Sequence, residues 1–191
     1  MEIASSAAKA FEELGCHVEE SDLALDSPQG PFKVIFSTNV YAGLGFLLDE
    51  QPGQLTDYVL EGLEDGRRYT GADYAKALGY RDKLIAQFAD QFEKYDLLLS
   101  PTMPIPAFRA GDNPTMIAGV EVDPFLGFLS YTFPINMIGQ EAASIPCGFS
   151  SDGMPIGLHI VGRPGDEETV IAASAAFEGA RPWIQHRPPV S

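Results

Sequence analysis

The chain has 191 residues, of which 45% are hydrophobic, so it is long enough to form one domain with a buried core. Its formal net charge is −15, from 27 acidic and 12 basic side chains, and the acidic residues are scattered along the sequence. This charge argues against direct binding to nucleic acid or to an anionic membrane surface, because both require a basic protein face. No run of residues is long and apolar enough to span a membrane, and residues 1–15 lack the features of a signal peptide.

The cysteine and histidine content predicts neither a disulfide nor a metal site. Cys16 and Cys147 are the only cysteines and lie far apart, which is typical of a reduced, cytoplasmic protein. The three histidines, His17, His159 and His186, are separated by long spacings that match no metal-binding motif. No glycine-rich nucleotide-binding motif occurs either.

Helical periodicity dominates the first half of the chain. It predicts helices over residues 4–14, 32–44, 55–63 and 70–95. Gly15 is expected to end the first helix and residues 16–19 to form a short strand. Thr70 and Asp73 have the spacing of a capping box, in which each side chain satisfies the other residue's free backbone amide. The buried stripe of the longest helix is predicted to be Tyr74, Leu78, Leu84, Ile85, Phe88 and Phe92.

The next segments alternate between strand, loop and helix signals. The apolar residues 97–99 predict a strand buried on both faces, as in a parallel sheet. Residues 102–122 are rich in proline, glycine and alanine, which predicts a long loop of the kind that lines binding sites. Asp123 and Pro124 are expected to begin a helix that Pro134 kinks or ends. Asp166 is expected to cap a last helix, with apolar positions at Val170, Ile171, Ala173, Ala175 and Phe177.

The strongest strand signal lies in residues 143–160, where apolar and small residues alternate on both sides of Asp152-Gly153. Asp-Gly is typical of a two-residue hairpin turn, and such a turn pairs Cys147 with Leu158. In this register the apolar residues of both strands share one face. The other face carries Ser144, Gly148, Gly157 and His159, which are small apart from the histidine and allow a helix or ligand to approach closely.

Two groups of residues resemble nucleophile sites, and the predicted structure argues against both. In the predicted register His159 lies on the face opposite Cys147, so the two cannot form a Cys-His pair. Ser150 and Ser151 stand beside glycines, but they enter the hairpin turn. Lys76, which could be proposed as their base, belongs to an ordinary amphipathic helix.

Four segments together resemble the C-terminal half of the amidase signature family. In chain order they are GRRYTGADYAKALGYRDKL, YDLLLSPTMPIPAF, TFPINMIGQEAASIPCGF and DGMPIGLHIVGRPGDEETVIAASAAFE. The resemblance implies an α/β fold with a mixed β-sheet covered by helices, of which residues 1–191 form the C-terminal portion as a single domain. It also implies hydrolysis of a carboxamide to a carboxylate plus ammonia or an amine, without a metal or organic cofactor.

The resemblance carries over residues of a cleft wall and no catalytic residue. Members of the family use a serine nucleophile, a second serine on a cis peptide and a lysine, from a Gly/Ser-rich signature and a lysine upstream of it. Neither feature has a match in this sequence. The positions that match the family near its substrate cleft are Pro101, Thr102, Phe133, Asn136 and Gln140. For each of them, support of the local backbone is the alternative role. Glu141 departs from the family pattern, which commonly has proline there.

Three interpretations follow. The chain is the C-terminal portion of an amidase and is inactive alone, or it is half of a split amidase or an amidotransferase A-type subunit completed by a partner chain, or it is a non-enzymatic interaction domain that reuses the fold. The expected partners are a small-molecule amide in the complete enzyme and either an N-terminal half or a second copy of the chain. An absent half would leave a sheet edge and an apolar face uncovered.

Overall fold

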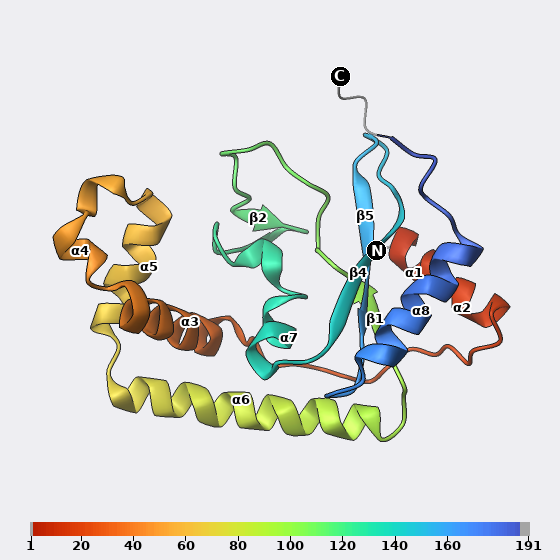
Figure 1. Ribbon diagram of the computed structural model, residues 1–191, viewed down its shortest axis with the longest axis horizontal. Helices are drawn as coiled ribbons and strands as arrows, with labels where there is room; N and C mark the ends of the chain where they lie inside the picture. The colour runs from red at the N-terminus through yellow and green to blue at the C-terminus, as the bar shows by residue number, and fades with distance from the viewer. Residues whose placement is uncertain (1, 188–191) are drawn as a thin grey trace. The chain divides into compact units, whose positions relative to one another are not determined.

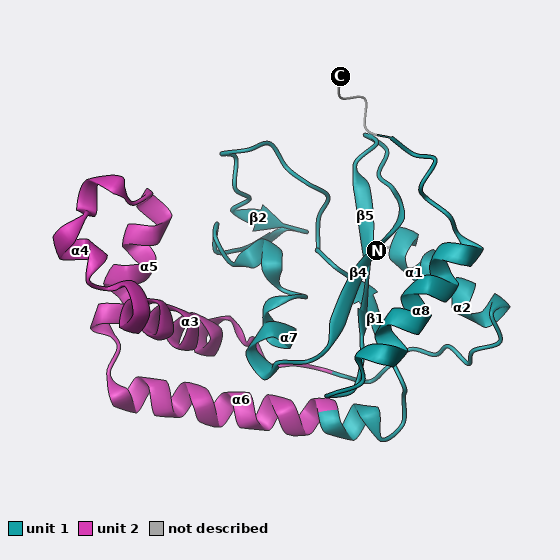
Figure 2. Ribbon diagram, viewed as in Figure 1, with its two compact units in different colours: residues 1–23, 89–191 teal, residues 24–88 magenta. Residues whose placement is uncertain are grey.

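The computed structural model of the protein describes residues 2–187. The chain divides into two compact units, one made of residues 1–23 and 89–191 and the other of residues 24–88 (Figure 2). That the whole chain forms a single domain stays a prediction. Within residues 2–187, no helix combines the length and the apolar character needed to cross a membrane.

The unit of residues 24–88 is built from helices. They are α3 (Gln29–Leu44), α4 (Leu47–Glu50), a 3-10 turn (Pro52–Gln54), α5 (Asp57–Arg68) and most of α6 (Gly71–Phe92). Helices α3 and α5 approach each other closely at Gly66, where an added Cβ atom would lie 2.1 Å from the Ser37 carbonyl oxygen. Only glycine permits this contact. An ion pair of 2.7 Å between Lys33 and Asp65 joins the same two helices.

The capping box predicted for α6 is confirmed. The Thr70 amide donates to Asp73 Oδ2 at 3.0 Å, and the Asp73 amide donates to Thr70 Oγ1 at 3.2 Å. Leu84, Phe88 and Phe92 are buried as predicted. Ile85 is 42% exposed, so its predicted burial is wrong. One residue of an α-helix turns about 100°, so Ile85 leaves the face that Leu84 occupies.

The unit of residues 1–23 and 89–191 contains a three-stranded sheet in the order β1-β5-β4 (Figure 1). The strands are β1 (Leu98–Pro101), β4 (Ala142–Phe149) and β5 (Pro155–Val161). Both pairings are antiparallel. The prediction that residues 97–99 form a strand of a parallel sheet is therefore wrong within the described chain. β1 is an edge strand of intermediate burial. Leu99 of β1 and Leu97, which precedes the strand, pack against the core.

The predicted hairpin is present, but its predicted register is wrong. Ile145 is paired with Leu158, and a bulge at Cys147 shifts the pairing toward the turn. The loop has three residues instead of two: the Ser150 amide donates to the Met154 carbonyl at 2.8 Å, and Gly153 has φ +78°. A type I turn followed by a left-handed glycine is the usual form of such a loop. Asp152-Gly153 fits both loop lengths, so the sequence pattern alone does not select between them.

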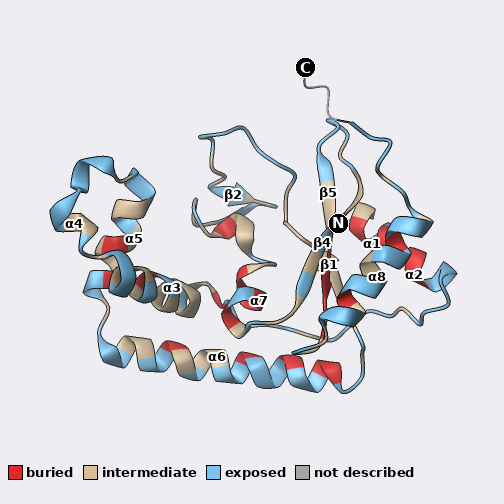
Figure 3. Cartoon of the chain, in the orientation of Figure 1, coloured by how far each residue is buried: buried red, intermediate tan, exposed pale blue. Residues whose placement is uncertain are grey.

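One face of the sheet forms the core of this unit. Helices α1 (Glu2–Ala8), α2 (Ala10–Glu13) and α8 (Glu167–Ala180) lie together on that side, and each carries buried positions (Figures 1 and 3). The buried cluster consists of Ala4, Ala7, Ala10, Phe11, Ile145, Leu158, Ile160, Val170 and Phe177. The α/β class and the cover of helices are therefore as predicted. The mixed sheet implied by the resemblance is represented here by three antiparallel strands.

The predictions for the first and last helical segments of this unit are confirmed only in part. Asp166 caps α8 as predicted, with its side chain accepting from the Thr169 amide at 3.3 Å. Ile171 is 67% exposed, so its predicted burial is wrong. The strand predicted for residues 16–19 is wrong, because no strand lies beside them to pair with in the described part of the chain. The predicted helix over residues 4–14 is two short helices, and Gly15 follows them with φ +89°.

The segment between β1 and β4 is mostly loop, as predicted. It contains two short paired strands, β2 (Met116–Ile117) and β3 (Val120–Glu121), a 3-10 turn (Gly127–Leu129) and helix α7 (Phe133–Ile138). Asp123 Oδ1 accepts from the amides of Phe125 and Leu126, but the helix predicted to begin here is wrong, since residues 124–126 form a turn that leads into the 3-10 turn. Pro134 lies in the first turn of α7 and does not end a helix. Proline is tolerated there because the first amides of a helix have no intrahelical acceptor.

Replacing Phe177 tests whether α8 holds the core together. Phe177 is fully buried and its ring stacks on Phe11 with 5.7 Å between centroids. Phe177→Ala should lower the free energy of unfolding by about 3–5 kcal/mol, because a large apolar side chain is replaced by a cavity. Ile171→Ala, in the same helix but exposed, should change it by less than about 0.5 kcal/mol. Urea denaturation followed by circular dichroism measures both, and equal losses would contradict the described packing of α8.

Candidate functional site

The face of the sheet opposite the core carries polar side chains from all three strands. In the ladder, His159 of β5 is the partner of Ser100 in β1 and of Ser144 in β4. Successive side chains of a strand point to opposite faces, so these three residues share the face that Leu158 and Ile160 do not use. We call Ser100, Thr102, Ser144 and His159 the polar row.

Thr102 joins the polar row through a contact across the central strand. Its Oγ1 lies 2.7 Å from Ser144 Oγ, so the two hydroxyls are hydrogen bonded and connect the two outer strands. Gly157 of β5 lies beneath this pair. An added Cβ atom there would lie 2.6 Å from Thr102 Oγ1 and 2.7 Å from Ser144 Oγ. The small residue predicted to allow a close approach therefore permits the meeting of two hydroxyls.

An apolar cavity of about 370 Å³ adjoins this hydroxyl pair. It is lined by Met103, Ile105, Pro106, Ala107, Phe108, Phe128, Pro155, Ile156 and Gly157. Phe108 and Phe128 meet edge to face with 5.0 Å between ring centroids and form one part of its lining. The loop after β1, the turn before α7 and the start of β5 thus come together here, although they are far apart in the sequence.

His159 is the buried titratable group of this face. Its side chain belongs to a residue that is 5% exposed, and its Nδ1 atom is buried without a hydrogen-bond partner among residues 2–187. Burial lowers the pKa of the imidazole, since the charged form loses its hydration. Nδ1 can donate or accept a hydrogen bond according to the tautomer of the neutral ring, and no described group makes that bond.

The structure does not bring the five predicted cleft residues to one point. Thr102 follows β1 and its amide donates to the Gly157 carbonyl, whereas Gln140 follows α7 and its Nε2 donates to the Gly162 carbonyl at 2.6 Å. These two carbonyls are five residues apart, or about 17 Å along an extended chain. Thr102 therefore lies near the apolar cavity and Gln140 does not.

The other predicted cleft residues differ in exposure. Pro101 ends β1 and directly precedes Thr102. Phe133 is 3% exposed, which suits support of the backbone, whereas Asn136 is exposed on α7. The roles of all five residues in a cleft stay predictions. The sequence analysis did not predict Ser100 or Phe128 as residues of the site. The place of Ser100 in the alternation of β1 was a signal that could have identified it. No sequence signal pointed to Phe128.

The nucleophile arrangements rejected from the sequence are rejected by the structure as well. Ser150 lies in the turn, where its Oγ accepts from the Met154 amide at 3.1 Å. Cys147 packs against the core cluster, so it lies away from the face of His159 even though the predicted register was wrong. Burial raises the pKa of the Cys147 thiol, which disfavours the thiolate needed for attack.

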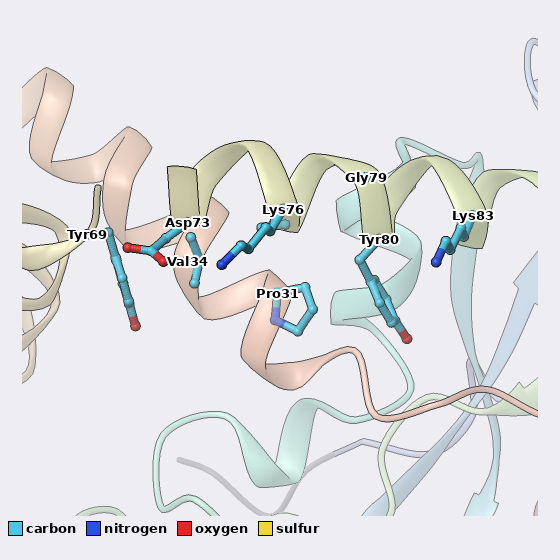
Figure 4. Close-up of a pocket in the computed structure, with 9 residues that line it drawn as sticks. Pro31, Val34, Tyr69, Asp73, Lys76, Gly79, Tyr80 and Lys83 are labelled. Carbon is cyan, nitrogen blue, oxygen red and sulfur yellow. The ribbon is translucent and has the colours of Figure 1, made fainter. Parts of the chain in front are cut away.

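Lys76 lies in the other unit, where it lines a hollow of about 590 Å³. Figure 4 shows Lys76, Tyr80 and Lys83 extending from one side of α6 around this hollow. Asp73 also lines it, and the hydrogen bond from the Thr70 side chain lowers the pKa of that carboxyl. No serine belongs to the lining, so the hollow offers Lys76 no hydroxyl to activate. In neither unit do three or more described His, Cys, Asp or Glu side chains come close enough to hold a metal ion.

Comparison with known proteins identifies the relatives of the chain. The sequence model of the family described as Amidase matches residues 49–171. An acylamidase from Rhodococcus erythropolis is 31% identical over 190 residues, covering 94% of this chain and 38% of that protein. The A-type subunit of the glutamyl-tRNA(Gln) amidotransferase from Moorella thermoacetica is 46% identical over 122 residues, covering 63% of this chain and 23% of that protein.

The fold agrees with these sequence relatives. The crystal structure of a bacterial aryl acylamidase of the amidase signature family matches with a TM-score of 0.86 and 30% identity, over 98% of this chain and 42% of that one. A 6-aminohexanoate cyclic dimer hydrolase matches with a TM-score of 0.81 over the same shares of the two chains. The chain thus spans about two fifths of the length of the proteins that it resembles throughout.

The burial of His159 predicts how stability depends on pH. Below a pH of about 6.5 the unfolded histidine binds a proton that the folded one resists, so the free energy of unfolding should fall as the pH falls from about 7 to 5. His159→Gln should make this dependence shallower, while the exposed His17→Gln serves as the control. Urea denaturation at a series of pH values measures the effect, and an unchanged slope in His159→Gln would contradict the described burial.

Proposed function

The chain belongs to the amidase family, and from this premise we propose that it is the C-terminal portion of an enzyme that hydrolyses a carboxamide to a carboxylate plus ammonia or an amine. The observation that carries the proposal is a continuous match over 94% to 98% of the chain that covers only 38% to 42% of the relatives. In this proposal the chain supplies part of the substrate cleft, and the reacting groups belong to the remainder of the fold.

The chemistry of the described residues supports this division. Amide hydrolysis needs an activated nucleophile with a base beside it and donors for the oxyanion. The Ser150 hydroxyl accepts a hydrogen bond from the Met154 amide within the turn, and burial raises the pKa of the Cys147 thiol and so favours its protonated form. The hydroxyls of Thr102 and Ser144 bond each other, and no described side-chain base is bonded to either. We therefore expect the chain to be inactive alone.

A split arrangement is a second candidate, in which a separate polypeptide supplies the lysine and serines. The 46% identity over 122 residues, which cover 23% of the A-type subunit of an amidotransferase, agrees with this arrangement as well as with the first. In that case contact with tRNA would fall to other polypeptides of the assembly, because the net charge of −15 opposes binding of phosphates by this chain. The free cysteines, Cys16 and Cys147, agree with the cytoplasm as the site of action in either arrangement.

A non-enzymatic interaction domain is the third candidate, and the polar row is the observation that favours it. A sheet face with hydroxyls can be solvated without a covering partner. The unpartnered Nδ1 of His159 argues against this candidate, because a sheet face adapted to contact water would leave no buried polar atom without a hydrogen bond. We therefore favour a face that another part of an amidase fold completes.

Hydrolysis assays of the purified chain test the proposal. With an anilide and a primary carboxamide as substrates, release of amine or ammonia should not exceed the uncatalysed rate, because no activated nucleophile is present. Ser150→Ala and Ser151→Ala should be indistinguishable from the unchanged chain. Turnover that either substitution abolishes would contradict both the assignment of these serines to the turn and the proposed inactivity of the chain alone.

A further inference from the structure

The hollow lined by α3 and α6 gathers the basic side chains of the helical unit that have no carboxylate partner. Six basic side chains belong to residues 24–88. Four of them form ion pairs with carboxylates of the same unit: Lys33, Arg67, Arg68 and Arg81. The other two are Lys76 and Lys83, which form no ion pair with any described carboxylate and line the same hollow of about 590 Å³. Two ammonium groups at one place are thus available to an anion from outside the chain.

Helical geometry places Lys76 and Lys83 on one side of α6. Seven residues make about two turns, so the two Cα atoms lie about 10.5 Å apart along the axis and on the same face. Tyr80 stands between them, and Figure 4 shows the three side chains extending from α6 around the hollow. Because a lysine ammonium ends a flexible four-carbon stem, both ammonium groups can turn toward one anion beside Tyr80.

Asp73 is the carboxylate of the lining, and it lies far from Lys83. The Thr70 amide and hydroxyl both donate to Asp73 Oδ2, at 3.0 Å and 2.6 Å. These bonds, and to a smaller extent the charge of Lys76, lower the pKa of the Asp73 carboxyl. Ten residues of α6 separate Asp73 from Lys83, or about 15 Å, whereas salt screens exposed charges over about 8 Å. An anion beside Lys83 is therefore repelled little by this carboxylate.

The rest of the lining offers apolar and aromatic surface. Pro31 and Val34 of α3 line the hollow together with Ala77 of α6. The Tyr80 hydroxyl donates to the Asp26 carbonyl at 2.5 Å, which holds the tyrosine ring at the edge of the hollow. Burial raises the pKa of this phenol, so Tyr80 stays uncharged and does not repel an anion. A volume of about 590 Å³ lies within the range of about 300–1,000 Å³ usual for small-molecule sites.

We propose that this hollow is a binding site for a small organic anion, namely a carboxylate or sulfonate with an aromatic or aliphatic body. Lys76 and Lys83 bind the anionic group through charge-assisted hydrogen bonds. Pro31, Val34 and Ala77 contact the apolar body. The site uses no residue of the polar row or of the apolar cavity, and it does not depend on a part for this chain in amide hydrolysis.

Binding of three matched compounds to the purified chain tests this inference. Phenylacetate should shift the backbone amide signals of Ala77 and Gly79 in a ¹H–¹⁵N NMR titration that saturates. The uncharged 2-phenylethanol should bind about tenfold more weakly, because it leaves both lysines without an anionic partner. The cationic 2-phenylethylamine should leave the signals unchanged. Equal affinities for phenylacetate and 2-phenylethanol, or no shift with phenylacetate, would overturn the proposed site.

Charge-removing variants locate the anionic group. Lys76→Gln and Lys83→Gln should each lower the affinity for phenylacetate about two- to fivefold, as expected for partly exposed ion pairs. Lys94→Gln removes the same charge outside the lining and should leave the affinity unchanged. The signal of Leu63, which is fully buried in α5, reports whether each variant keeps the packing of the helical unit. Equal losses in all three variants, or unchanged affinity in folded Lys76→Gln and Lys83→Gln proteins, would overturn the assignment.

Discussion

The structure of the sheet-containing unit depends on the burial of one side of β5. Leu158 and Ile160 are 1% and 0% exposed, and they pack in the cluster that α1, α2 and α8 build on the sheet. β5 is also the strand that pairs with both others. Because side chains alternate along a strand, fixing Leu158 and Ile160 in the core fixes Gly157 and His159 on the opposite face. The core thereby determines where the candidate site lies.

The irregularities of the hairpin fall in β4 and in the turn, and β5 stays regular. The bulge at Cys147 lets β4 change its pairing while Ile145 keeps its place opposite Leu158. On the other face, Gly157 leaves room for the hydroxyls of Thr102 and Ser144 to meet over β5. The same strand thus supplies a packed side that stabilises the unit and an open side that adjoins an apolar cavity.

The features that the sequence predicted correctly are those that depend on neighbouring residues. Thr70 and Asp73 form their capping box, and Asp166 caps α8, because each interaction spans one helical turn. The apolar face of the hairpin was also predicted for Ile145, Leu158 and Ile160, since alternation is a local signal. Between the bulge and the turn the prediction is wrong, because Gly148 pairs with Ile156 and Phe149 is 41% exposed. The register of the hairpin was not predicted, because one extra loop residue and one bulged residue leave the alternation unchanged.

The features that the sequence did not predict depend on segments far apart in the chain. Residues 16–19 have the composition of a strand, but no strand lies beside them in the described structure. The apolar cavity is lined by Phe128 together with residues from 103–108 and 155–157, and no spacing in the sequence predicts that these segments lie close together. The resemblance grouped Thr102 with Gln140, whereas the structure places them near opposite ends of β5. Family motifs therefore identified the protein class better than the geometry of its site.

Whether this portion of an amidase fold lacks a nucleophile of its own is tested most directly by covalent labelling. A fluorophosphonate reacts with serine hydroxyls that a neighbouring base has activated, and intact-protein mass spectrometry detects the adduct without any choice of amide substrate. We expect the purified, folded chain to keep its unmodified mass. One adduct per chain on any serine, lost when the protein is unfolded before labelling, would contradict the assignment of this chain to the cleft wall alone.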